Sequence, residues 1–120
     1  MVDPGRGVRE SLRMVLQAEY DVVLAAGYFE GLVAVHETKP DLVFWSVEMP
    51  EASGFEILRL LAEIAPGTQV VLTTMTASPV IQRNALQGGA LDCLVKPFGA
   101  TEVLAAVEKG MSQAEPKCGE

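Results

Sequence analysis

The stretch KPDLVFWSVEMPEASGFEILRLL (residues 39–61) decides how this chain folds. Its first half is an apolar run rich in β-branched and aromatic residues, which is typical of a strand buried on both faces, here over Asp41–Val47. Its second half opens with Ser53–Glu56, a capping-box pattern that predicts the start of a helix. The apolar run stops on Ser46, at the carboxyl end of the predicted strand. Open α/β sheets usually place their chemistry at this edge.

The same alternation of apolar segments and helical spacing continues along the chain. Strands are expected over Met1–Asp3, Tyr20–Ala25, Asp41–Val47, Gln69–Thr74 and Asp92–Val95. Helices are expected over about Gly7–Ala18, Tyr28–Thr38, Ser53–Ala65, Pro79–Gln87 and Ala100–Met111. Strands that alternate with helices predict a doubly wound α/β fold, in which a parallel sheet is covered by helices on both faces. Met1–Asp3 is very short for a strand at the centre of such a sheet.

Length and composition indicate one domain. A chain of 120 residues with 49% hydrophobic content buries about two-thirds of its unfolded surface in a single core. Residues 1–111 are expected to form that domain, and residues 112–120 a frayed tail. The formal charge of −7 and the scattering of nine Lys and Arg residues argue against direct binding to nucleic acid, which basic patches recognise.

Cysteine usage and hydropathy indicate a soluble protein of the cytoplasm. Cys93 and Cys118 form neither a metal-ligand spacing nor a disulfide framework. No apolar run approaches the roughly 18 residues that a membrane span needs, and the start MVDPGRG lacks the apolar stretch of a signal peptide. We therefore expect no membrane association.

Three stretches together resemble the receiver domain of two-component response regulators, over about residues 2–111. They are GVRESLRMVLQAEYDVV (7–23), residues 39–61 quoted above, and GGALDCLVKPF (88–98). The resemblance implies a flavodoxin-like fold with five helices and a five-stranded parallel sheet of order 2-1-3-4-5. In that family an aspartate at the end of the third strand accepts a phosphoryl group from a histidine kinase. An acidic pair after the first strand holds Mg²⁺ there.

The resemblance assigns positions in this chain to the site. The pattern around DLVFWSVEMP puts Ser46 on the phospho-acceptor position, and VDPGRG keeps Asp3 of the acidic pair but sets Pro4 in place of the second acid. Thr74 and Lys96 match the residues that contact the phosphoryl oxygens.

Two further positions follow from the same resemblance. Cys93 stands where the family usually has an aromatic switch residue, and the Lys96–Pro97 bond is expected to be cis. The simplest interpretation of Cys93 is a small, buried hydrophobic residue.

These substitutions change the expected chemistry. A carboxylate is ionised at neutral pH and serves as both nucleophile and metal ligand, whereas the Ser46 hydroxyl needs a neighbouring general base. Only Asp3 and Glu48 remain as weak candidate ligands for Mg²⁺, which prefers one or two carboxylates with water and phosphate. In the family the Glu48 position binds metal through its backbone carbonyl. We therefore expect no cofactor, and we expect Lys96 to pair with Asp3.

The sequence therefore favours an atypical receiver of the pseudo-receiver type, which is not an enzyme and signals through protein contacts without phosphorylation of an aspartate. Its expected partner is a histidine kinase, an output protein, or a second copy docked through the face of the fourth helix, fifth strand and fifth helix. The first alternative is a phosphorelay receiver phosphorylated by another route, on Ser46 or through an altered magnesium site. A second is a small enzyme or flavin-binding domain on the same topology.

Overall fold

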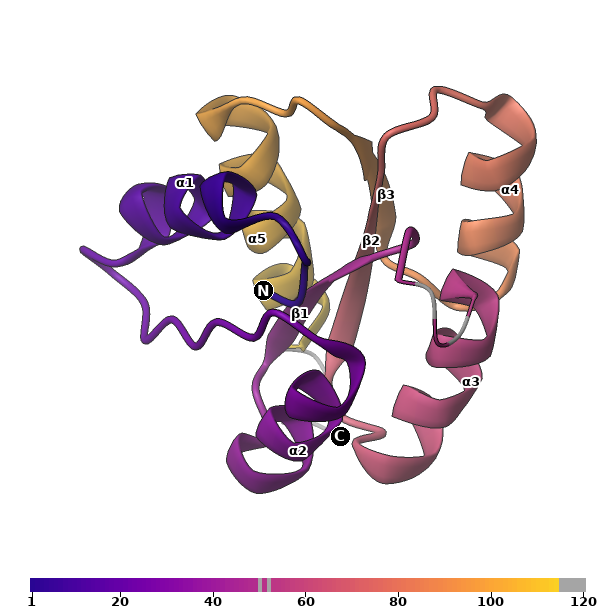
Figure 1. Cartoon of the computed structure of the whole chain (residues 1–120), viewed down its shortest axis with the longest axis horizontal. Coiled ribbons are helices and arrows are strands. Elements are labelled where there is room, and N and C mark those ends of the chain that lie inside the picture. Colours follow the sequence, from indigo (N-terminus) through magenta and orange to yellow (C-terminus); the bar gives the residue numbers. More distant parts are fainter. Residues whose placement is uncertain (50, 52, 115–120) are drawn as a thin grey trace.

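The computed structural model describes residues 1–49, 51 and 53–114, which form an α/β sandwich (Figure 1). The elements of this part of the chain are, in order, α1 Arg6–Leu16, α2 Tyr28–Thr38, β1 Leu42–Ser46, α3 Gly54–Ile64, β2 Gln69–Thr74, α4 Pro79–Gln87, β3 Asp92–Val95 and α5 Ala100–Ala114. The three strands are parallel and lie in the order β1-β2-β3. The predicted class, a parallel sheet with helices on both faces, is confirmed.

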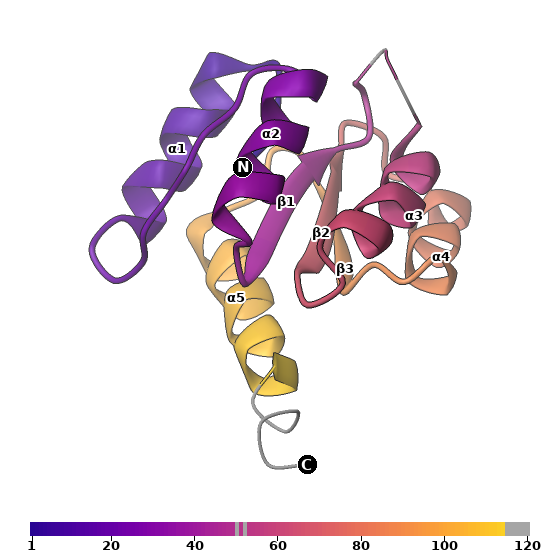
Figure 2. The ribbon, with the colours of Figure 1, turned by 90° about the horizontal axis from the view of Figure 1, so that it is seen from below.

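Side chains that alternate along the strands build two cores, one on each face of the sheet. On one face Trp45 and Leu72 pack with residues of α2, α3 and α4, and on the other Phe44 and Val71 pack with residues of α1 and α5. Figure 2 shows this separation, with α1 and α5 on one side of the strands and α3 and α4 on the other. Burial of the strands on both faces explains their continuous apolar runs.

The structure differs from the prediction at the first two expected strands. Neither Met1–Asp3 nor Tyr20–Ala25 is a strand, and each takes part only through an isolated parallel bridge, Val2 to Ala25 on one side and Val2 to Trp45 on the other. The Val2 amide donates to the Phe44 carbonyl at 2.7 Å, and the Ala25 amide donates to the Met1 carbonyl at 3.0 Å. Three residues are too short to pair along a neighbouring strand, so most of the 20–25 segment has no ladder to join.

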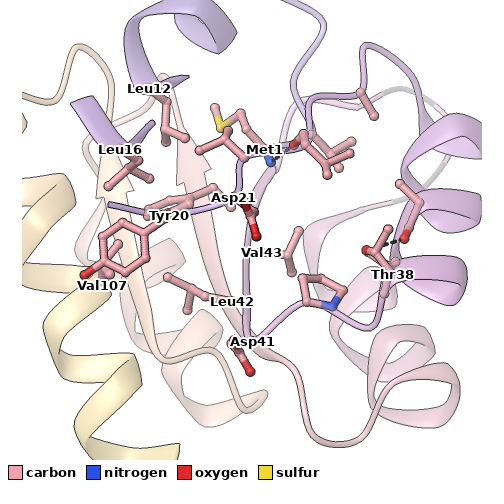
Figure 3. A pocket seen from close by; sticks show the side chains of 18 of the residues that line it. Met1, Leu12, Leu16, Tyr20, Asp21, Thr38, Asp41, Leu42, Val43 and Val107 are labelled. Atoms are coloured by element: carbon pink, nitrogen blue, oxygen red, sulfur yellow. Dashed lines mark hydrogen bonds between the residues drawn. The ribbon is translucent and has the colours of Figure 1, made fainter. Parts of the chain in front are cut away.

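A cavity of about 610 Å³ lies beside this incomplete edge (Figure 3). It opens at the amino end of β1, between Leu42, Met1 and the segment that contains Tyr20 and Asp21. The cavity is therefore found where a full strand would have continued, at the opposite end of β1 from Ser46.

The helix boundaries follow the predicted capping chemistry. The Ser53 hydroxyl accepts from the Glu56 amide while the Glu56 side chain accepts from the Ser53 amide, which is the predicted capping box. The Ser78 hydroxyl caps α4, with Pro79 in its first turn. Helix α5 continues to Ala114, so residues 112–114, expected in the tail, are helical, and residues 115–120 lie outside the described part of the chain.

Candidate functional site

Polar side chains gather at the carboxyl edge of the sheet. Ser46 and Thr74 are the last residues of β1 and β2, and Lys96 directly follows β3. The register places Ser46 beside Thr73 and Thr74 beside Val95, so the three strand ends meet at one level. Asp3 directly follows the Val2 bridge to β1. The fold thus brings together four of the residues that the sequence had singled out.

A buried ion pair joins Asp3 to Lys96. The Lys96 Nζ atom lies 2.6 Å from Asp3 Oδ2, and the side chains are only 12% and 2% exposed. The other carboxylate oxygen, Oδ1, accepts from the Gly5 amide at 2.7 Å. Lys96 therefore pairs with Asp3, as expected for a lysine that has no aspartate to meet at position 46.

Ser46 lies at the centre of the cluster and is almost fully buried. Its hydroxyl oxygen accepts from Lys96 Nζ at 3.1 Å and from the Glu48 amide at 3.2 Å. The hydroxyl donates to Glu48 Oε1 over 3.4 Å, which is a long bond for a hydroxyl donor. Both acceptor positions of the oxygen are thus occupied, and its one bond to a carboxylate within the described residues is the long one to Glu48.

The Glu48 carboxylate has the largest set of partners at this edge. Its Oε2 atom accepts from the Thr74 hydroxyl at 2.7 Å and from the Met75 amide at 3.0 Å, and its Oε1 atom lies 3.5 Å from Lys96 Nζ. Burial by itself would raise the pKa of Glu48. The hydrogen bonds from Thr74 and Met75, together with the charge of Lys96, outweigh burial and lower the pKa below its usual value of 4.5, so the carboxyl is ionised at neutral pH.

The remaining candidate residues lie at or beyond the margin of the cluster. Cys93 belongs to the core on the α2–α3–α4 face. Burial, with the charges of Asp92 and Glu48, raises the pKa of its thiol above the usual 9.0, so the thiol is protonated at neutral pH. Pro4 is exposed, the Lys96–Pro97 peptide bond is cis, and Cys118 lies outside the described residues.

The arrangement does not fit a magnesium ion. Mg²⁺ needs near-octahedral oxygen ligands, but the Lys96 ammonium lies within 4 Å of both candidate carboxylates, Asp3 and Glu48, where its charge repels a cation. Residues 1–49, 51 and 53–114 contain no group of three or more His, Cys, Asp or Glu side chains that could hold a metal ion. The Lys96 ammonium therefore offsets one of the two carboxylate charges and repels a metal cation from both carboxylates.

Sequence reasoning named Glu48 only as a weak metal ligand and did not predict that its side chain accepts from Thr74 and Met75. The turn after β1, in which the Glu48 amide donates to the Ser46 hydroxyl, directs this side chain back over the sheet edge toward Thr74. A serine followed by an acid two positions later is a weak signal of such a turn. It could have raised the possibility that the carboxylate stays at the edge.

Comparison with known proteins identifies the scaffold. Residues 1–108 match the family model described as the response regulator receiver domain. The chain belongs to the response regulator receiver domain family. The receiver is 34% identical over 120 residues to the response regulator MprA of Mycobacterium sp. (strain KMS). The matched region covers 99% of this chain and 52% of that protein. The receiver thus spans about half the length of the curated relatives it matches.

Solved structures agree with the fold of this receiver. A response regulator from Thermotoga maritima has a TM-score of 0.84 at 28% identity, over 92% of this chain and 93% of the other. The chemotaxis response regulator CheY4 of Vibrio cholerae has a TM-score of 0.80 at 28% identity, over 91% and 93% of the two chains. None of the helices in the described part of the receiver is long and apolar enough to cross a membrane.

Proposed function

We propose that this receiver is an atypical, pseudo-receiver module that signals through protein contacts and does not use phosphorylation of an aspartate. The observation that carries the proposal is Ser46. A neutral, buried hydroxyl, hydrogen-bonded by Lys96, stands where the family's nucleophile would be. A serine hydroxyl is a weak nucleophile without an activating base, and its bond to the Glu48 carboxylate is long, at 3.4 Å. The proposal includes no enzymatic activity and no cofactor.

The charges of the cluster support the same proposal. Asp3 and Glu48 share the single Lys96 ammonium, which leaves the cluster of three groups with one negative charge in excess. An incoming phosphoryl donor is itself an anion and would meet this charge without a metal to offset it. The exposed Pro4 supplies no second acid beside Asp3.

Phosphorylation of Ser46 by another route is the weaker candidate. The side chain is almost fully buried at the sheet edge, so a separate kinase would have to open the turn after β1 to reach it. Modification sites are more often found on exposed, loosely held segments.

For partners, we propose the face formed by α4, β3 and α5. Arg83, Asn84 and Gln87 lie exposed on α4 beside the half-exposed Val80 and Leu86, and this mixed polar and apolar surface suits a reversible contact. The candidate partners are a histidine kinase, an output protein or a second copy of this chain. Among solved structures of the same fold, one is described as the NtrC4 receiver domain dimer.

We also propose that Val2 and Ala25 mark the first two strands of the five-stranded order 2-1-3-4-5. The support is that Val2 bridges to Ala25 on one side and to Trp45 of β1 on the other, in parallel on both sides. The same proposal takes residues 1–111 as the receiver domain.

Incubation of the protein with acetyl phosphate and Mg²⁺, followed by intact mass measurement, tests the functional proposal. The expected result is no covalent gain on the parent chain. The Ser46→Asp variant should also stay unmodified, because Pro4 still leaves the acidic pair incomplete. The double variant Ser46→Asp with Pro4→Asp should gain more phosphoryl mass than either the parent chain or Ser46→Asp. A labile gain of one phosphoryl group on the parent chain would overturn the proposal.

A further inference from the structure

The Glu48 carboxylate is held as a bound anion would be. Its Oε2 atom accepts from a hydroxyl, Thr74 Oγ1 at 2.7 Å, and from a backbone amide, Met75 at 3.0 Å. Its Oε1 atom faces the ammonium of Lys96 at 3.5 Å and the hydroxyl of Ser46 at 3.4 Å. A hydroxyl, a main-chain amide and an ammonium are the donors that proteins use to bind carboxylate and phosphate oxygens.

The donor groups are fixed by other contacts in the structure, whereas the carboxylate is attached through a side chain in a short turn. Thr74 is fully buried at the end of β2, and its hydroxyl also accepts from the Thr76 amide at 3.1 Å, which fixes the loop that carries the Met75 amide. Lys96 directly follows β3 and is fixed by its ion pair with Asp3. Glu48 lies in the turn after β1, with its side chain 31% exposed. The donors would remain in place if this side chain turned out to solvent.

We propose that Glu48 is a built-in ligand, whose carboxylate fills an oxyanion-binding site made by the Thr74 hydroxyl, the Met75 amide and the Lys96 ammonium. The site thereby excludes free tetrahedral oxyanions of the phosphate type. The inference goes beyond the proposed function and does not depend on it, because it concerns reversible binding and forms no covalent bond at Ser46.

The attachment of the carboxylate to the chain explains why a free anion competes poorly. A group attached two residues from the strand end is present at the site at a high effective concentration. A free anion binds only to the fraction of molecules whose Glu48 side chain has turned away, and its apparent affinity falls by that fraction. Removal of the carboxylate should therefore expose a site that is already shaped.

The test is a titration of the full chain with inorganic phosphate at constant ionic strength, followed by the amide NMR signal of Met75. In Glu48→Ala the signal should shift in a saturable way, with an apparent affinity at least about tenfold tighter than in the parent chain, as expected when a competing charge-assisted contact is lost. Glu48→Gln keeps the size of the side chain but not its charge. Its apparent affinity for phosphate should lie between those of Glu48→Ala and the parent chain.

Two control variants sharpen the test. Glu63→Ala removes an equal charge from an exposed position on α3 and should behave like the parent chain. Addition of Thr74→Val to Glu48→Ala should abolish the saturable shift, because the hydroxyl donor is gone. A response of equal midpoint in the parent chain, Glu63→Ala and Glu48→Ala would overturn the proposal, as would the absence of a saturable response in both Glu48 variants.

Discussion

Two apolar segments of this receiver have similar sequences but different secondary structures. QVVLTT (residues 69–74) forms β2, pairs with β1 and β3, and leaves Val71 and Leu72 with no exposed surface. YDVVLA (residues 20–25) forms no strand, contributes one bridge at Ala25, and leaves Val23 half exposed. Apolar, β-branched content is common to both segments. A strand therefore forms where a partner strand lies alongside, and content alone is not sufficient.

The largest expected effect comes from the truncation of one apolar side chain to alanine in each segment. Leu72→Ala in β2 should lower the free energy of unfolding by about 2–5 kcal/mol, because it removes a fully buried side chain and leaves a cavity. Val23→Ala should change it by less than about 0.5 kcal/mol, since half of that side chain is exposed. Urea denaturation followed by circular dichroism measures both. Equal losses would mean that residues 20–25 contribute as much to stability as β2.

The second effect tests the polar end of the well-paired region. Lys96→Met should lower the free energy of unfolding by about 3 kcal/mol, because it leaves Asp3 buried and charged without a partner. The double variant Lys96→Met with Asp3→Asn should recover most of this loss, since Asp3 then carries no buried charge and the partly exposed Glu48 carboxylate keeps its bonds from Thr74 and Met75. A double-mutant cycle in urea gives the coupling energy. Additive losses would show that the ion pair does not act as a unit.

The third effect tests the point where the incomplete edge meets the core. A Cβ atom added to Gly31 of α2 would lie 2.8 Å from side-chain atoms of both Trp45 and Val2. Gly31→Ala should therefore lower the free energy of unfolding by about 1–3 kcal/mol through overpacking. Gly7→Ala, at a helical glycine of α1 with open space around it, should instead be neutral or slightly stabilising. Thermal unfolding of the two variants compares them, and a stable Gly31→Ala would show that Val2 can move aside.

The smallest expected effect is on the fall of stability at acidic pH. The pKa of Glu48 is lower in the folded protein than its usual value of 4.5, so the folded state binds fewer protons there than the unfolded state. Its contribution to stability is fully present above that pH and is lost as the pH falls through the lower, folded pKa. Glu48→Gln should therefore flatten the fall in stability below about pH 4.5, as measured by urea denaturation at several pH values. Parallel curves for the variant and the parent chain would contradict this.

The sequence predicted most of the fold because its helices and inner strands carry local signals. The capping box at Ser53 and the Ser78–Pro79 start of α4 were readable as short patterns, and both are present. The segment at residues 20–25 was predicted as a full strand because of its apolar content, and the structure shows only the bridge from Ala25 to Val2. Whether residues 1–3 could pair along it depended on tertiary context that the segment itself does not carry.

The candidate site could be predicted in part from the order of the strands. Parallel strands bring their carboxyl ends to one edge, so the clustering of Ser46, Thr74 and Lys96 follows from the strand assignments alone. The direction of the Glu48 side chain was not readable, because it depends on the backbone path of the turn after β1. A single turn thus decides whether a carboxylate faces solvent or Thr74.

The placement of Trp45 has a practical consequence. It is the single tryptophan of the chain, it is fully buried, and the Tyr28 ring of α2 meets it edge-on at 6.4 Å between ring centroids. Its intrinsic fluorescence therefore reports on the docking of α2 against the sheet. Detachment of that helix would admit water to the indole and shift its emission to longer wavelength.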